Sequence, residues 1–371
     1  MLEWLVAALA AALLAYQLAS PDARIGDDDF QVFYTGAAAI AAGHSPYIGD
    51  FVSPPWFALA LVPLTWLPLA AARGVWLALG LALLLGTTAG CARLVGLEWP
   101  ARRLVLAALV FGLWPPVEFG LKLGQNSLLV WALIVAALLA AQAHRYAFTG
   151  ALIGLALVKP QLVVLFAAGL AVRAAPQRAI SRYLGAAATV VAALALAVWL
   201  VAPDAYADLL ALRPHTWEYW GSTVALPPLL AQVSGSQTFG IAAYLLVAIV
   251  GGLAVLREWA RDCQRSIAPV AALTAAASLV LAPYTYPHDA VLLQLPILWL
   301  VPWVHALPRS AWRTWLAVGV CALCGLWLLE RPADYTPWRF LGLLPPLGLL
   351  LALVFARRAL SYSTTAAPRH S

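Results

Sequence analysis

The sequence predicts an all-α integral membrane protein, a polytopic bundle of about 10–13 transmembrane helices with a polar first external loop. Hydrophobic residues occupy 64% of the 371 positions and charged residues only 10%, and the mean hydropathy is +0.86. Soluble domains carry about a quarter charged residues, so this composition excludes a water-soluble fold. Apolar stretches of about 16–22 residues recur along the whole chain, and each is about long enough to span a bilayer.

These apolar stretches give the predicted crossings, which together fill residues 1–371 as a single domain. Two half-length runs between residues 148 and 172 are joined by Lys159-Pro160-Gln161, and we interpret them as a hairpin of two short crossings. The hairpin brings the total to about twelve. The other predicted crossings are residues 2–19, 73–91, 104–120, 128–142, 181–201, 239–256, 267–282, 290–303, 312–329 and 340–355.

The charged residues set the predicted orientation and explain the net charge of +6 without a nucleic-acid partner. With both termini in the cytoplasm, most of the 22 basic residues fall in cytoplasmic loops and most of the 16 acidic residues fall outside. Residues 51–70 contain four prolines and are interpreted as a partly inserted element. A full crossing there, with the hairpin counted as a single crossing, would place Arg93, Arg102, Arg103 and Arg145 outside. External loops are therefore expected at about residues 20–72 and about residues 203–238.

The first external loop contains the most acidic run of the chain, Asp27, Asp28 and Asp29. Three adjacent carboxylates repel one another, which costs stability unless a cation, a proton or a catalytic role compensates. A solvated acidic loop is the simpler interpretation. The run is nevertheless a candidate for a general base.

Further polar residues are predicted on the same outer side. Lys122 and Lys159 are the only lysines of the chain, and Lys159 lies at the tip of an apolar hairpin, where a cation needs a partner or an aqueous cavity. Lys122 could instead snorkel to the surface. His288 and Asp289 follow Tyr286 at the start of a predicted helix, where Asp289 could serve as a cap and His288 could be structural.

A carboxylate loop, two lysines and a histidine at one membrane face suit a reaction between a membrane-borne phosphate ester and a hydroxyl acceptor. A carboxylate would act as general base, and lysine or histidine would neutralise the departing phosphate. The chain has no Gly-rich phosphate-binding loop, and nucleotide sugars are not expected outside the cytoplasm. The sugar donor should therefore be lipid-linked.

The order of motifs resembles a known family. The segments DDDFQVFYTGAAAIAAGHSPY, VSPPWFALALVPL, GQNSLLVWALI, GALIGLALVKPQ and APYTYPHDAVLLQLP resemble, in this order, the polyprenol-phosphate-mannose-dependent α-1,2-mannosyltransferases of glycosyltransferase family 87. These belong to the GT-C superfamily of multi-helix membrane enzymes with an essential aspartate in the first external loop. The resemblance implies an inverting hexosyltransferase that uses a polyprenyl-phosphate sugar and a lipid or glycan acceptor. Its expected location is the bacterial inner (plasma) membrane, with the active site facing outward.

The resemblance also implies roles for particular residues. Asp29, before Phe30 and the Val-Phe-Tyr step, matches the family's general base, with Asp27 and Asp28 as alternatives. The expected ligands of the donor phosphate are His288, Lys159 and Lys122. No metal or other cofactor is required, although the oxygen-rich Asp run is compatible with a divalent ion. The expected substrate-binding residues are Tyr34, Gln125, Asn126, Gln161, Tyr286 and Asp289.

A polytopic secondary transporter is the main alternative function. Transporters place ionisable groups near the bilayer midplane on several helices and often contain two related halves. Here such residues are predicted at one surface, and the two halves show no evident similarity. A lipid-linked oligosaccharide ligase or a phosphoethanolamine-type transferase would usually carry a larger soluble domain, which these residues do not encode.

Overall fold

The computed structural model describes residues 2–19, 29–211, 225–262, 266–306 and 343–365. The elements in these ranges are helices, and no strand occurs in them, which confirms the predicted all-α class. The predicted crossing at residues 312–329 and the residues Asp27 and Asp28 lie outside the described ranges.

Long apolar helices cross the body of the protein. Within the described ranges, three are long and apolar enough to span a membrane: α4 (Leu69–Val95), α10 (Ile180–Val201) and α14 (Gln237–Arg261). A fourth span is possible if α5 (Ala101–Leu113) and α6 (Pro115–Leu123) form one bent crossing. The protein is thus a multi-pass membrane protein, while the total of about twelve crossings remains a prediction.

The bend between α5 and α6 interrupts a stretch that the sequence analysis treated as one crossing. The two helices meet at an angle of 78°. Trp114 is extended, with φ −67° and ψ 125°, and Pro115 and Pro116 open α6. A residue before proline is driven out of the α conformation, and proline lacks the N–H that would continue the helix, so the turn follows from local sequence.

Shorter helices complete the bundle. The expected hairpin forms α8 and α9, which are interrupted at Lys159-Pro160. The predicted crossing at 290–303 is divided into the 3₁₀ helix η3 and α16. The bounds are α1 Leu2–Ala19, α7 Ser127–Gln142, α8 Tyr146–Ala156, α9 Pro160–Ala174, η2 Ala175–Gln177, α13 Leu226–Ser234, α15 Ala268–Leu281, η3 Pro287–Leu293, α16 Gln294–Ala306 and α19 Leu344–Thr365.

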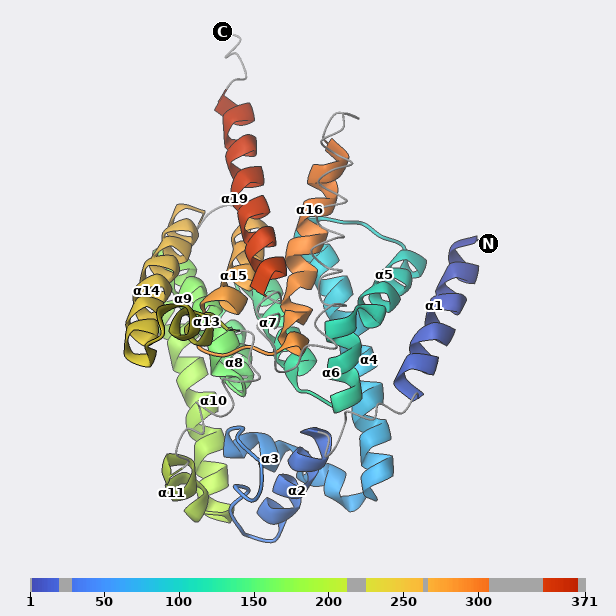
Figure 1. Ribbon diagram of the computed structural model, residues 1–371, viewed down its shortest axis with the longest axis vertical. Helices are drawn as coiled ribbons and strands as arrows, with labels where there is room; N and C mark the ends of the chain where they lie inside the picture. Colours follow the sequence, from blue (N-terminus) through green and yellow to red (C-terminus); the bar gives the residue numbers. More distant parts are fainter. Residues whose placement is uncertain (1, 20–28, 212–224, 263–265, 307–342, 366–371) are drawn as a thin grey trace.

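A layer of short helices lies at one end of the bundle. It contains α2 (Asp29–Ala41), α3 (Pro55–Leu61), η1 (Val62–Trp66) and α11 (Asp204–Ala211). Figure 1 shows α2, α3 and α11 together at its lower end, while α16 and α19 extend toward the opposite end. Residues 20–72 are predicted as the first external loop, and α2 is a helix within this range that was not predicted. Its residues Phe30, Phe33, Ala37 and Ile40 recur at helical spacing and are buried.

The core of the bundle surrounds α7. Trp131, Ile134 and Leu138 on this helix are fully buried. The Trp131 indole donates to Gln294 Oε1 at 3.0 Å, and Gln294 Nε2 donates to Thr88 Oγ1 at 3.3 Å, so a buried polar chain joins α7, α16 and α4. Buried polar groups are tolerated when they are hydrogen-bonded, and this chain fixes the three helices relative to one another.

We expect Gly150→Ala to destabilise the protein. A Cβ at Gly150 would lie 2.0 Å from the backbone carbonyl oxygen of Tyr183 on α10, so α8 and α10 would have to separate. Overpacking of this kind costs about 1–3 kcal/mol or more. The apparent melting temperature in detergent should therefore fall. Gly185→Ala on α10 is the matched control, because a Cβ there meets nothing within 4 Å. Equal melting temperatures for the two variants would contradict this packing.

Candidate active site

The predicted site residues come together at helix ends between the outer layer and the bundle. Asp29 begins α2, and Gln125 lies in the short link between α6 and α7. Lys159 lies between α8 and α9, and His288 and Asp289 lie in η3. Residues that are up to 260 positions apart in sequence thus meet because each ends or begins a helix at the same level of the fold.

Glycines bring the backbones close enough for this contact. Gly124 ends α6 with φ +70°, and a Cβ there would lie 2.5 Å from Cβ of Phe30 on α2. The Trp76 indole of α4 donates to the Gly124 carbonyl at 2.8 Å and fixes the same turn. A positive φ strongly favours glycine, and only a residue without Cβ leaves room for α2 here. The turn places Gln125 beside Asp29.

Gln125 joins the carboxylate of Asp29 to the ammonium of Lys159. Its Nε2 donates a hydrogen bond to Asp29 Oδ2, and its Oε1 accepts one from Lys159 Nζ at 3.2 Å. Asp29 is half-buried. The link connects the outer layer to the tip of the α8–α9 hairpin.

Lys159 is held by several acceptors. Its Nζ donates to Ser127 Oγ and to Asp289 Oδ1, both at 2.8 Å, and lies 3.3 Å from His288 Nε2. The Lys159 side chain is 12% exposed and that of Asp289 is fully buried. A cation at this depth requires a partner or an aqueous cavity, and Asp289 is the partner.

Asp289 is fully engaged with protein groups. Its Oδ1 also accepts from Ser127 Oγ at 2.8 Å, and its Oδ2 accepts from the Tyr286 backbone N–H at 3.0 Å, so the alternative of a helix cap is confirmed. Burial raises the pKa of Asp289, but Lys159, His288 and these hydrogen bonds outweigh burial and hold the pKa below its usual value. Asp289 is therefore an ionised structural partner of Lys159.

His288 is buried in its neutral form. Burial and the neighbouring Lys159 lower its pKa to about 3, against a smaller opposite effect of Asp289. An ammonium can only donate, so its approach to Nε2 leaves the imidazole proton on Nδ1. This Nδ1 is buried and has no hydrogen-bond partner among the described residues. The ring stacks on Tyr286 with centroids 5.4 Å apart, and Gly120 packs against its Cβ.

The other expected substrate-binding residues differ in their surroundings. Asn126 is fully buried, and neither polar atom of its amide has a partner in the part of the chain that the structure describes. Gln161, in the first turn of α9, is also buried, and its Oε1 has no hydrogen-bond partner among the described residues. Tyr34 instead donates to the Leu67 carbonyl at 2.9 Å and joins α2 to the start of α4. Unpartnered buried polar atoms are costly and point to a ligand or water.

Lys122 has a different partner from Lys159, and within the described ranges no hydrogen bond or ion pair joins it to Lys159, His288 or Asp289. Its Nζ lies 2.8 Å from Oε1 of Glu118, one turn earlier on α6, and both side chains are largely buried. The spacing of four residues in the sequence indicated this pair, yet the sequence analysis did not consider Glu118. It also missed Ser127, whose contacts to Lys159 and Asp289 depend on a fold that no local pattern reveals.

The described residues contain no group of three or more His, Cys, Asp or Glu side chains placed to hold a metal ion. Of the expected Asp run, only Asp29 lies within them. The cation that faces Asp29 across Gln125 is an ammonium of the protein itself.

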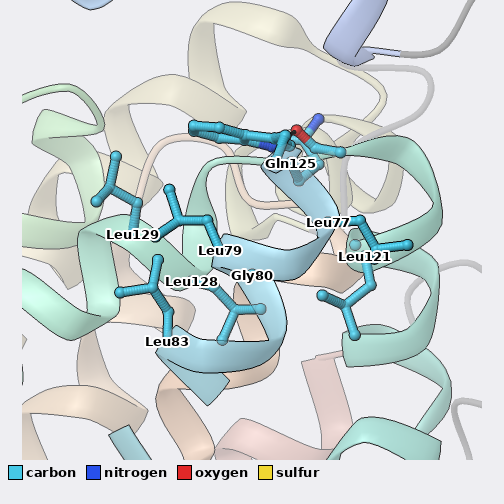
Figure 2. Close-up of a pocket in the computed structure, with 11 residues that line it drawn as sticks. Leu77, Leu79, Gly80, Leu83, Leu121, Gln125, Leu128 and Leu129 are labelled. Atoms are coloured by element: carbon cyan, nitrogen blue, oxygen red, sulfur yellow. Dashed lines mark hydrogen bonds between the residues drawn. The ribbon is translucent and has the colours of Figure 1, made fainter. Parts of the chain in front are cut away.

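Two apolar spaces adjoin the site. One is a narrow pocket between α4, α6 and α7, and Figure 2 shows Gln125 at one end of it with Leu79, Leu83, Leu128 and Leu129 beyond. The other is a groove of about 540 Å³ between α1, α4 and α5, lined only by alanine, leucine and valine. Leu77 of α4 lines both spaces.

Comparison with known proteins gives one family. The family model described as Glycosyltransferase family 87 matches residues 51–283, more than half of the chain. Gln125 and Lys159 lie inside the matched range, whereas Asp29 and His288 lie outside it. No curated protein and no solved structure matches.

We expect Lys159→Met to destabilise the protein by about 3–5 kcal/mol, because it leaves the buried Asp289 carboxylate without its cation. The double variant Lys159→Met/Asp289→Asn removes the unpaired charge and should be more stable than the single variant. Melting temperatures in detergent would measure both. A double variant less stable than Lys159→Met would contradict the pairing.

Proposed function

Because the chain belongs to glycosyltransferase family 87 and is a membrane glycosyltransferase, we propose that it transfers a mannose-like hexose from a polyprenyl-phosphate donor to a hydroxyl acceptor. The reaction takes place on the non-cytoplasmic face of the bacterial inner membrane. Family membership favours this enzyme over the transporter alternative. The proposal rests above all on the connection of Asp29 through Gln125 to Lys159, which places a carboxylate and a cation in one site.

Asp29 is the general base of the proposed reaction. It accepts the proton of the acceptor hydroxyl, whose oxygen attacks the anomeric carbon of the donor sugar. The bond between that carbon and the phosphate oxygen breaks, and its electrons remain on the polyprenyl phosphate. Attack from the opposite face inverts the configuration. The half-buried position of Asp29 at the start of α2 supports this role, because an acceptor can approach it from the outer layer.

The departing phosphate gains negative charge, and His288, Lys159 and Lys122 are the proposed groups that stabilise it. The buried Nδ1–H of His288 has no acceptor among the described residues, which supports a hydrogen bond to an incoming anion. Lys159 already donates to Ser127, Asp289 and Gln125, so its contribution is the field of a fixed cation. Lys122 must exchange its contact with Glu118 to reach a ligand.

Asn126, Gln161 and Tyr286 are the proposed contacts to the sugar. The two amides carry buried polar atoms without partners in the described ranges, as expected for groups that hydrogen-bond hydroxyls of a ligand. Tyr286 offers an aromatic face beside His288. Tyr34 and Asp289 are engaged by the protein, so their proposed influence on the substrate is indirect.

The apolar groove supports a lipid-linked donor. A polyprenyl chain has no polar atoms beyond its phosphate, and the side chains that line the groove between α1, α4 and α5 are all alanine, leucine or valine. Leu77 lines both this groove and the pocket that carries Gln125. In the proposed binding mode, the chain lies in the groove with its phosphate end toward that pocket.

The arrangement of the elements supports an outward site with cytoplasmic termini. In Figure 1, α1 begins and α19 ends in the upper part of the view, whereas α2, α3 and α11 lie at the lower end. Both ends of the described bundle therefore face away from the layer that contains Asp29. In Figure 1, the connection between α4 and α5 lies away from that layer. Arg93 is in the last turn of α4 and Arg102 in the first turn of α5, which agrees with the positive-inside rule for cytoplasmic termini.

We expect Asp29→Asn to lower the transfer rate by about 10²–10⁴-fold, because the amide cannot accept the hydroxyl proton. The measurement uses membranes containing the protein and radiolabelled polyprenyl-phosphate mannose. Asp50→Asn, an exposed carboxylate of the same outer segment, is the control and should keep wild-type activity. Transfer that survives Asp29→Asn would exclude Asp29 as the base. Transfer from a soluble nucleotide sugar alone would exclude the donor class.

We expect Ala15→Phe to weaken the use of long-chain donors, because Ala15 lines the groove and a phenyl ring would occupy the space of the chain. The KM for a long polyprenyl-phosphate donor should rise about tenfold, while that for a short, water-soluble isoprenyl analogue should not change. Ala12→Phe, on an exposed position of α1 outside the groove lining, is the control. Identical effects of the two variants on both donors would contradict this use of the groove.

A further inference from the structure

The side-chain amide of Gln125 lies between two opposite charges. Its N–H group faces the Asp29 carboxylate and its carbonyl faces the Lys159 ammonium. An amide has a fixed polarity, since its nitrogen only donates and its oxygen only accepts. The reversed orientation would direct N–H toward the cation and oxygen toward the carboxylate. Both contacts would be lost, so this arrangement suits an ionised Asp29 and a protonated Lys159.

Lys159 cannot move toward Asp29 to replace the amide. Ser127 and Asp289 hold its Nζ at 2.8 Å each from the bundle side. Gln125 itself is fixed by the turn after α6, where Trp76 binds the Gly124 carbonyl and Phe30 packs against Gly124. The amide is therefore a spacer of defined length between an anchored cation and the proposed base.

We propose that Gln125 is a positioning residue that separates Asp29 from Lys159 and orients the carboxylate for its role as base. This inference rests on the proposed function of Asp29. A direct ion pair would draw the carboxylate toward Lys159 and reduce its affinity for a proton, which is the property that a base needs. The neutral amide holds one carboxylate oxygen by a hydrogen bond and keeps the cation one residue away.

Gln125 connects Asp29 to the charged residues of the bundle, and other titratable groups lie on the elements that surround α2. The helices α3 and η1, which pack against α2, contain no titratable side chain. The helix α4 also packs against α2, and its titratable residues are Arg73, Cys91 and Arg93. Arg73 donates a hydrogen bond to the backbone carbonyl of Lys122 at 3.2 Å. Across Gln125 stand Lys159, His288 and Asp289. Tyr34 is the other titratable residue of α2.

Two substitutions separate the functions of the amide. Gln125→Glu keeps the size and the contact with Lys159 but turns a carboxylate toward Asp29, and repulsion between like charges should raise the pKa of Asp29 by about one unit or more. Gln125→Met keeps the volume and removes both hydrogen bonds, so Asp29 loses its orientation. The matched control is Gln237→Glu, which adds the same charge at an exposed position at the start of α14.

The test follows Asp29 itself, independently of turnover. A water-soluble carbodiimide reacts with protonated carboxyl groups, and mass spectrometry of the peptide containing Asp29 gives the extent of modification against pH. We expect the midpoint for Gln125→Glu to lie about one pH unit or more above wild type. The midpoint for Gln237→Glu should equal that of wild type. Unchanged midpoints in both Glu variants would overturn the proposal.

Transfer kinetics provide the second readout. We expect Gln125→Met to lower kcat about tenfold or more with little change in the donor KM, because a misdirected base affects the chemical step rather than donor binding. A rise in KM at constant kcat would instead assign Gln125 to substrate binding and overturn the positioning role. If wild-type protein transfers no sugar from any lipid donor, the proposed function fails, whereas the modification midpoints still test the spacer.

Discussion

The site depends on the placement of one ammonium group in an apolar bundle. Lys159 lies at the break of the α8–α9 hairpin, and Asp289, buried in η3, balances its charge. Removing either charge alone leaves the other uncompensated in a poorly solvated place. The pair therefore fixes the hairpin against η3, Ser127 adds the start of α7, and Gln125 extends the connection to α2. One electrostatic requirement thus determines how four separate segments meet.

Close backbone packing makes this meeting possible. Because glycine has no Cβ, Phe30 packs closely against Gly124 and His288 against Gly120. In the same way, Gly150 allows α8 to lie against α10. The bend at Trp114 turns α6 so that its end, rather than its side, faces the outer layer. Helix ends carry polar backbone groups and short links, and the charged side chains of the site lie close to one another there, while the helix bodies are mostly apolar. The helix ends therefore carry the residues of the site, and the helix bodies provide the apolar surface that a membrane protein needs.

Much of this arrangement could be predicted from periodicity and charge. The first helix at 2–19 and the break at Lys159-Pro160 agree with the structure, because apolar length and proline act locally. The helix at 29–41 was missed because its acidic start concealed the apolar spacing that follows. The contacts of Gln125 and Ser127 could not be predicted, since they depend on where distant helices end. The family resemblance indicated Gln125 without indicating that it bridges two charges.

The open side of the apolar groove has a consequence for how the proposed donor arrives. The groove between α1, α4 and α5 is lined by apolar side chains, so the proposed polyprenyl donor would enter it by lateral diffusion within the membrane plane. Encounter then scales with the mole fraction of donor among the surrounding lipids, and not with its amount per volume of the suspension. For an enzyme that uses such a donor, the bilayer is both solvent and substrate reservoir.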